Sequence, residues 1–148
     1  MKRLILLLLL VSSVAFSQTT DYNTKKGFVA NGYDVVAYFN NKALEGNKTY
    51  TTKHDGVHYK FVSKENLNTF KESPEKFIPQ YGGYCAYAIA TKANKVSINP
   101  KSFEIKKGKL YLFYNAWGTN TLELWKQENS DTLIKKADKN WNQIKLKK

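Results

Sequence analysis

The chain has 148 residues, 14% of them aromatic, a formal net charge of +12, two histidines and one cysteine. This density of aromatic and aliphatic residues excludes a disordered tail, and the length suits one domain with a hydrophobic core. A single cysteine excludes an internal disulfide and a closed zinc site of four Cys or His ligands. We interpret the scattered lysines as a solvated surface, and no zinc-finger or helix-turn-helix pattern indicates a nucleic-acid partner.

The N-terminus has the pattern of a secretory signal peptide. A basic start precedes an apolar run over residues 4–11, and Ala15 and Ser17 stand at the small-residue positions of a cleavage site. The run is short for a transmembrane anchor, which needs about 20 apolar residues. We therefore predict a cleaved signal peptide at 1–17, an exported protein that is periplasmic or secreted and has no transmembrane anchor, and a flexible lead-in over 18–29.

The remaining residues predict an α+β fold, in which a small antiparallel sheet of hairpins packs against several short helices in one compact domain. Asp55-Gly56 is a strong hairpin-turn signal, and Ser63 and Ser73 are the expected N-caps of two short helices. The expected elements are a turn and short strand within 32–39, strands at 48–52 and 57–62, helices at 64–72 and 74–78, a helix beginning just after 83, strands at 103–105 and 110–114, and helices through 122–125 and 131–141.

Cys85 is the main candidate for a functional residue. It follows the Gly82-Gly83 pair, and the Ala-rich residues around it predict a helix that begins at this point. In a first helical turn, the unpaired N–H groups and the helix dipole favour a thiolate, so Cys85 could react or bind a metal ion. The alternative is a buried cysteine that only packs the core, because free cysteines are among the most buried residues.

Asp34 and His58 are candidate ligands, each with a structural alternative. Asp34 follows Gly32-Tyr33 and either caps a turn with its side chain or points an oxygen into a site. His58 lies between Val57 and Tyr59 in a predicted strand, which places its side chain on the polar face. It is therefore either a surface residue or a metal ligand.

The motifs around Cys85 and Asp34 resemble those of exported bacterial YHS-domain proteins. The resemblance covers nearly all of the chain after the predicted signal peptide and is most specific around Cys85. Some members of the group that the chain resembles carry selenocysteine at the position that matches Cys85. A selenium atom there implies chemistry at this position. The segments that carry the resemblance are Gly32-Tyr33-Asp34-Val35-Val36-Ala37-Tyr38-Phe39, Tyr59-Lys60-Phe61-Val62-Ser63-Lys64-Glu65-Asn66, Phe70, Ser73-Pro74-Glu75-Lys76-Phe77, Tyr81-Gly82-Gly83-Tyr84-Cys85-Ala86-Tyr87-Ala88, Gly108-Lys109-Leu110-Tyr111-Leu112-Phe113-Tyr114-Asn115 and Ala137-Asp138-Lys139-Asn140-Trp141.

The chain also departs from this group at several positions. Related modules on metal-transporting proteins carry several cysteines, whereas the matching segment here, residues 61–66, has none. Val35 stands where the exported group has proline. Because valine does not fix φ as proline does, we expect a less constrained turn beside Asp34. His54 and His58 lie outside the motif positions, so the resemblance assigns no role to either histidine.

The resemblance implies a YHS-like domain over residues 30–148 with a C-terminal helical extension. Our leading hypothesis is a module that binds a soft transition metal ion, copper or zinc, through Cys85 and Asp34 and exchanges it with a metal donor or acceptor of the envelope. A second hypothesis is a redox protein in which Cys85 is catalytic and an external thiol is the reductant. The third is a non-catalytic binding domain of the envelope.

Overall fold

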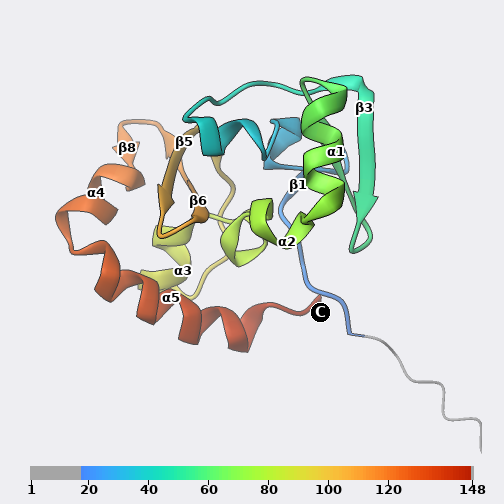
Figure 1. The fold of residues 1–148 in the computed structure, drawn as a ribbon. Coiled ribbons are helices and arrows are strands. Elements are labelled where there is room, and N and C mark those ends of the chain that lie inside the picture. Colours follow the sequence, from blue (N-terminus) through green and yellow to red (C-terminus); the bar gives the residue numbers. More distant parts are fainter. Residues whose placement is uncertain (1–17, 148) are drawn as a thin grey trace, which may run out of the picture.

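The structure is a computed structural model that describes residues 18–147, so the predicted signal peptide at 1–17 lies outside the described residues. Small sheets and short helices alternate along the chain, as the predicted α+β class requires (Figure 1). None of the helices within 18–147 has the length and apolar character needed to cross a membrane. The elements are β1 (Thr24–Lys25), β2 (Phe28–Val29), η1 (Ala30–Gly32), η2 (Ala37–Asn40), β3 (Asn47–His54), β4 (Val57–Phe61), α1 (Lys64–Glu72), α2 (Pro74–Phe77), η3 (Gln80–Gly83), α3 (Ala86–Lys92), β5 (Asn99–Lys106), β6 (Lys109–Phe113), β7 (Asn115–Ala116), β8 (Thr119–Asn120), α4 (Thr121–Gln127) and α5 (Ser130–Ile144).

The first half of the molecule is built on the hairpin of β3 and β4. Asp55 and Gly56 form its turn, both with positive φ, which confirms the prediction from the Asp-Gly pair. The alternation along β4 buries Tyr59 and leaves His58 exposed, again as predicted. The hairpin is extended by β2, which pairs with β4 in parallel, to give the strand order β1-β2-β4-β3.

Two short helices cover the buried face of this hairpin. Ser63 caps α1 by accepting a hydrogen bond from the N–H of Asn66 (3.1 Å). Phe70 on α1 packs against Tyr59, with ring centroids 4.7 Å apart. Pro74 occupies the first turn of α2, where its missing N–H costs no hydrogen bond. Both predicted helices are therefore present.

The strand predicted within residues 32–39 is wrong. The chain forms 3-10 turns there, η1 and η2, with one isolated bridge between Tyr33 and Glu45. The cause is Asp34, whose Oδ1 accepts hydrogen bonds from the N–H groups of Val36 (2.8 Å) and Ala37 (3.1 Å). These bonds fold the backbone back on itself, which confirms the turn-capping interpretation of Asp34.

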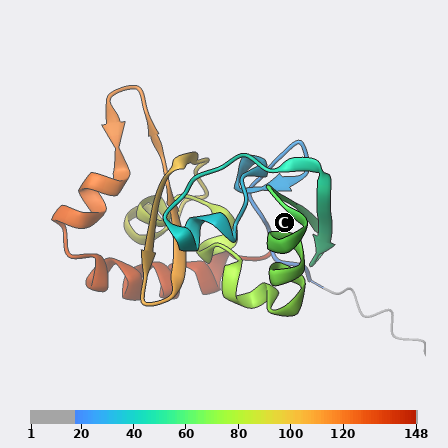
Figure 2. The same cartoon turned by 45° about the horizontal axis from the view of Figure 1, so that its top comes forward.

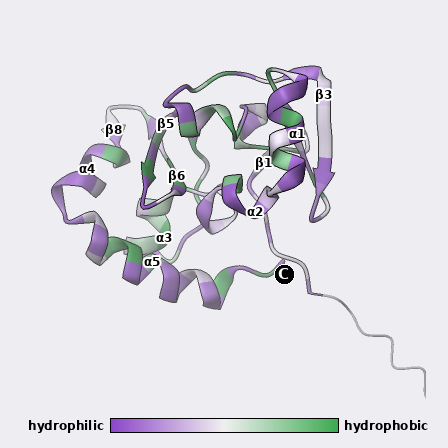
Figure 3. Ribbon diagram, viewed as in Figure 1, coloured by the Kyte–Doolittle hydropathy of each residue, from purple (hydrophilic) through white to green (hydrophobic). Residues whose placement is uncertain are grey.

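The second half of the molecule is built on the hairpin of β5 and β6. This hairpin is a separate two-stranded sheet, whereas the sequence indicated one sheet made from both hairpins. Leu110 and Phe113 on β6 are fully buried, and Phe113 shares a core with Leu133 and Ala137 of α5, whereas Leu110 belongs to the core of the first half. Figure 3 shows the resulting alternation of hydrophobic and hydrophilic residues along α5.

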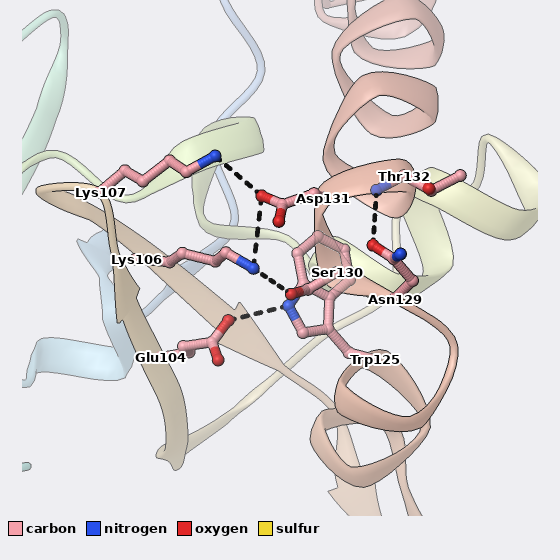
Figure 4. Close-up of polar contacts among 8 residues, drawn as sticks. All are labelled: Glu104, Lys106, Lys107, Trp125, Asn129, Ser130, Asp131 and Thr132. Carbon is pink, nitrogen blue, oxygen red and sulfur yellow. Dashed lines mark hydrogen bonds and ion pairs between the residues drawn. The ribbon is translucent and has the colours of Figure 1, made fainter.

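Polar contacts fasten α4 and α5 to the β5–β6 hairpin (Figure 4). Trp125 is fully buried and donates its Nε1–H to Glu104 Oε2 (2.9 Å). Asp131, in the first turn of α5, lies 2.9 Å from Lys107 Nζ and 3.4 Å from Lys106 Nζ. The hydrogen bond from Lys107 holds the pKa of Asp131 below its ordinary value. Exposed ion pairs add little stability, so we expect the buried Trp125 to contribute most of the stability with which α4 and α5 pack on the hairpin.

The segment at 18–29, predicted as a flexible lead-in, is hydrogen-bonded to the body of the protein. The N–H of Asp21 donates to the carbonyl of Lys145 (2.7 Å), and the N–H of Asn23 donates to the carbonyl of Gly82 (2.8 Å). Figures 1 and 2 show this segment beside the end of α5. The N-terminal segment of the described chain is thus hydrogen-bonded both to the residue after α5 and to η3.

Substitution of Gly82 tests this close approach. Gly82 has φ +61°, and an added Cβ would lie 2.5 Å from the backbone oxygen of Asp21, whereas Gly27 has φ +82° and open space around it. Both Gly82→Ala and Gly27→Ala strain the backbone, but only the first creates a clash. We expect Gly82→Ala to lower the free energy of unfolding by about 1–3 kcal/mol more than Gly27→Ala in urea denaturation. Equal losses in the two variants would contradict the close approach.

Candidate functional site

Cys85 lies between η3 and α3. Tyr81 and Gly82 both have positive φ, which kinks η3 and directs the chain into α3. Cys85 is the N-cap residue of that helix: its N–H donates to the carbonyl of Val96 (2.9 Å), and its carbonyl accepts from the N–H of Ile89 (3.1 Å). The predicted helix beside Cys85 is confirmed, although Cys85 precedes its first helical residue. The side chain of Cys85 is fully buried.

The thiol of Cys85 is oriented by Thr121. The Sγ atom lies 3.3 Å from Thr121 Oγ1, and Thr121 Oγ1 lies 2.7 Å from the carbonyl oxygen of Tyr114. A hydroxyl group has one proton to donate, and Thr121 gives it to that carbonyl, so the thiol is the donor to Thr121. Sequence reasoning did not identify Thr121, because nothing local marks a threonine at the start of α4 as a partner of Cys85.

A surface hollow of about 450 Å³ adjoins Cys85 and Thr121. Of the described residues that line it, only Lys92 is charged, and none is a histidine or a carboxylate. Tyr87 also lines the hollow and donates its hydroxyl to Glu128 Oε1 (2.6 Å). This hydrogen bond, followed by burial and the charges of Glu128 and Cys85, raises the pKa of Tyr87. The buried thiol thus lies beside a hollow whose described lining combines hydroxyl groups, one amide and apolar side chains.

Asp34 is surrounded by a different set of residues. Its carboxylate is fully buried, and Oδ2 accepts hydrogen bonds from the N–H of Val62 (2.9 Å) and the Nδ2 of Asn66 (2.7 Å). With the two bonds to Oδ1 described above, each oxygen has two donors. Within residues 18–147, no cluster of three ligating side chains contains Asp34 or Cys85. The metal-ligand role of Asp34 stays a prediction, and its observed contacts are structural.

His58 is exposed on the outer face of β4, and the centroids of its ring and the Phe28 ring are 5.9 Å apart. This is the position expected of a surface residue. It shares no described metal-ligating cluster with Cys85 or Asp34.

Comparison with known proteins gives no match to a family model, a curated protein or a solved structure. The resemblance to YHS-domain proteins therefore stays a prediction from the motifs quoted above. The function proposed below depends on the geometry around Cys85.

Asp34→Asn distinguishes a structural carboxylate from a ligand. The substitution replaces one acceptor oxygen by an NH₂ group that faces N–H donors. In metal-free protein with chelator present, we expect a loss of about 2–3 kcal/mol in the free energy of unfolding, measured by urea denaturation. Asp55→Asn, at the exposed turn, is the control and should change it by less than about 0.5 kcal/mol. Unchanged stability in Asp34→Asn would contradict the structural role.

Proposed function

We propose that the chain is an exported thiol redox protein in which Cys85 reduces a small hydroperoxide and is regenerated by an external thiol. The observation that carries the proposal is the combination at Cys85 of one oriented thiol and an adjoining hollow large enough for a small molecule. The predicted signal peptide supports export of the protein. The sequence has a single cysteine and therefore no second thiol to resolve the oxidised Cys85, so the reducing thiol would come from another molecule.

The reaction has two stages. Cys85 first loses its proton to water, and the thiolate attacks the terminal O–H oxygen of the hydroperoxide, so that an S–O bond forms and the O–O bond breaks. The alkoxide or hydroxide that leaves takes up the released proton and departs as an alcohol or water. The sulfur is oxidised by two electrons to a sulfenic acid. An external thiol then displaces water to form a mixed disulfide, and a second thiol releases Cys85 and leaves as the oxidised disulfide.

The surroundings of Cys85 give less support to soft-metal binding. A copper or zinc ion prefers further thiolate or imidazole ligands, and the described residues around the hollow supply hydroxyl and amide groups instead. Asp34 is the oxygen ligand predicted from the sequence, but both of its oxygens already accept two hydrogen bonds. A metal ion there would have to replace bonds that hold the fold. Thiol chemistry needs no second ligand.

Reaction with hydrogen peroxide tests the proposal. We expect dimedone, a reagent for sulfenic acids, to add once per chain after peroxide treatment and not to add to Cys85→Ser, with the products counted by intact-mass spectrometry. A small thiol added before dimedone should remove the sulfenic acid. Because Thr121 orients the sulfur, Thr121→Val should slow the peroxide reaction about tenfold or more.

Thr119→Val is the matched control, since Thr119 lines the same hollow but is exposed and is not the hydroxyl partner of Cys85. It should react at the rate of the unaltered protein. A native protein whose Cys85 resists peroxide, with adduct formed only after denaturation, would contradict the proposal and favour a cysteine that packs the core.

A further inference from the structure

Three side chains able to bind a metal ion meet where the β3–β4 turn faces α2. His54 ends β3, Asp55 lies in the turn, and Glu75 lies in the first turn of α2. His54 Nε2 lies 3.1 Å from Glu75 Oε1 and 3.6 Å from Asp55 Oδ2. One ligating atom from each residue lies within 4.8 Å of the other two, so a single ion could contact all three.

The spacing of these atoms suits a small divalent ion. Two ligands that are each about 2.1 Å from a tetrahedral zinc ion lie about 3.4 Å from each other. The two distances from His54 Nε2 fall on either side of this value. The side chains of Asp55 and Glu75 are 57% and 81% exposed, whereas that of His54 is 26% exposed, so the cluster opens to water on the carboxylate side. One imidazole and two carboxylates are ligands that zinc and similar ions accept.

Neighbouring residues hold two of the three ligands in place. The ring of His54 packs edge-on against Phe70, with centroids 6.0 Å apart and an interplanar angle of 88°. The hydroxyl of Tyr22 donates to Asp55 Oδ2 (3.2 Å) and restrains that carboxylate. Outer contacts of this kind orient ligands and tune their affinity for a metal ion. The cluster is thus partly arranged before any ion binds.

An independent observation comes from Tyr59, whose ring packs against Phe70 with centroids 4.7 Å apart, and the ring of His54 contacts the same Phe70 ring. Tyr59 is 1% exposed, and its hydroxyl has no hydrogen-bond partner among the described residues. Burial raises the pKa of Tyr59, and the charges of Tyr22, Asp55 and Glu75 raise it further. A buried hydroxyl without a partner is unfavourable. A metal-bound water molecule that reached the Tyr59 oxygen would give this hydroxyl a hydrogen-bond partner.

We propose that His54, Asp55 and Glu75 form a binding site for a divalent transition metal ion of the zinc type, with water as its fourth ligand. The site is separate from Cys85 and does not depend on the thiol chemistry proposed above. The competing interpretation is a protonated His54 paired with two carboxylates, which would give no specific metal binding.

Zinc titration of the full chain carrying Cys85→Ser tests the site, because this background removes zinc binding by the thiol. We expect isothermal titration calorimetry to give one zinc ion per chain. Adding His54→Ala or Glu75→Gln should weaken the affinity by about 10- to 100-fold, and adding Tyr22→Phe by about tenfold. His58→Ala removes the other histidine, on the outer face of β4, and should leave the affinity unchanged.

Glu75→Gln keeps the size of a side chain that is 81% exposed, so it tests the ligand without disturbing the core. Circular dichroism of each variant confirms folding. Absence of saturable zinc binding up to about 1 mM would overturn the proposal. Equal affinities in Glu75→Gln, His54→Ala and His58→Ala would also overturn it, because zinc would then bind elsewhere on the protein.

Discussion

The first half of the molecule depends on the buried carboxylate of Asp34. Its four hydrogen bonds connect η2, the residue after β4 and the first turn of α1, and they come from three backbone N–H groups and the amide of Asn66. A buried charge is tolerated when its oxygens are paired in this way, and removing a partner leaves it uncompensated. The apolar residues 35–39 therefore form a turn, although their composition favours a strand.

Local signals made much of the fold predictable, whereas pairs of residues far apart in the sequence could not be predicted. The Asp55-Gly56 turn and the Ser63 cap act over a few residues, so the sequence alone identifies them. Asp34 has partners 28 and 32 positions away in Val62 and Asn66, and Cys85 meets Thr121 36 positions away. A single sequence does not reveal such pairs. Thr121 was missed for this reason. The strand predicted within 32–39 is wrong for a local reason, because Asp34 accepts hydrogen bonds from the N–H groups of Val36 and Ala37 and turns the chain.

The two sites proposed here suit different chemistry because their surroundings differ. Cys85 is fully buried beside a hollow whose described lining residues include no imidazole, carboxylate or second thiol, so a soft metal ion would lack the further ligands it prefers. His54 and the carboxylates around it stand at an open edge of the hairpin, where an ion can enter and keep a water ligand. The sequence directed attention to a metal ion between Cys85 and Asp34. The metal site that we propose from the folded chain is centred on His54.

We propose that Cys85 is a reactive thiol reached through its hollow, and labelling of the thiol in the native protein distinguishes this from a thiol exposed only by unfolding. The rate at which a small disulfide reagent modifies Cys85 is measured from zero urea up to concentrations just below the unfolding transition. We predict a rate that is nearly constant at low urea, because the reagent enters the folded protein. A rate that rises with urea from the start, with the full slope of global unfolding, would show that Cys85 reacts only after unfolding and would contradict a reactive thiol in the native protein.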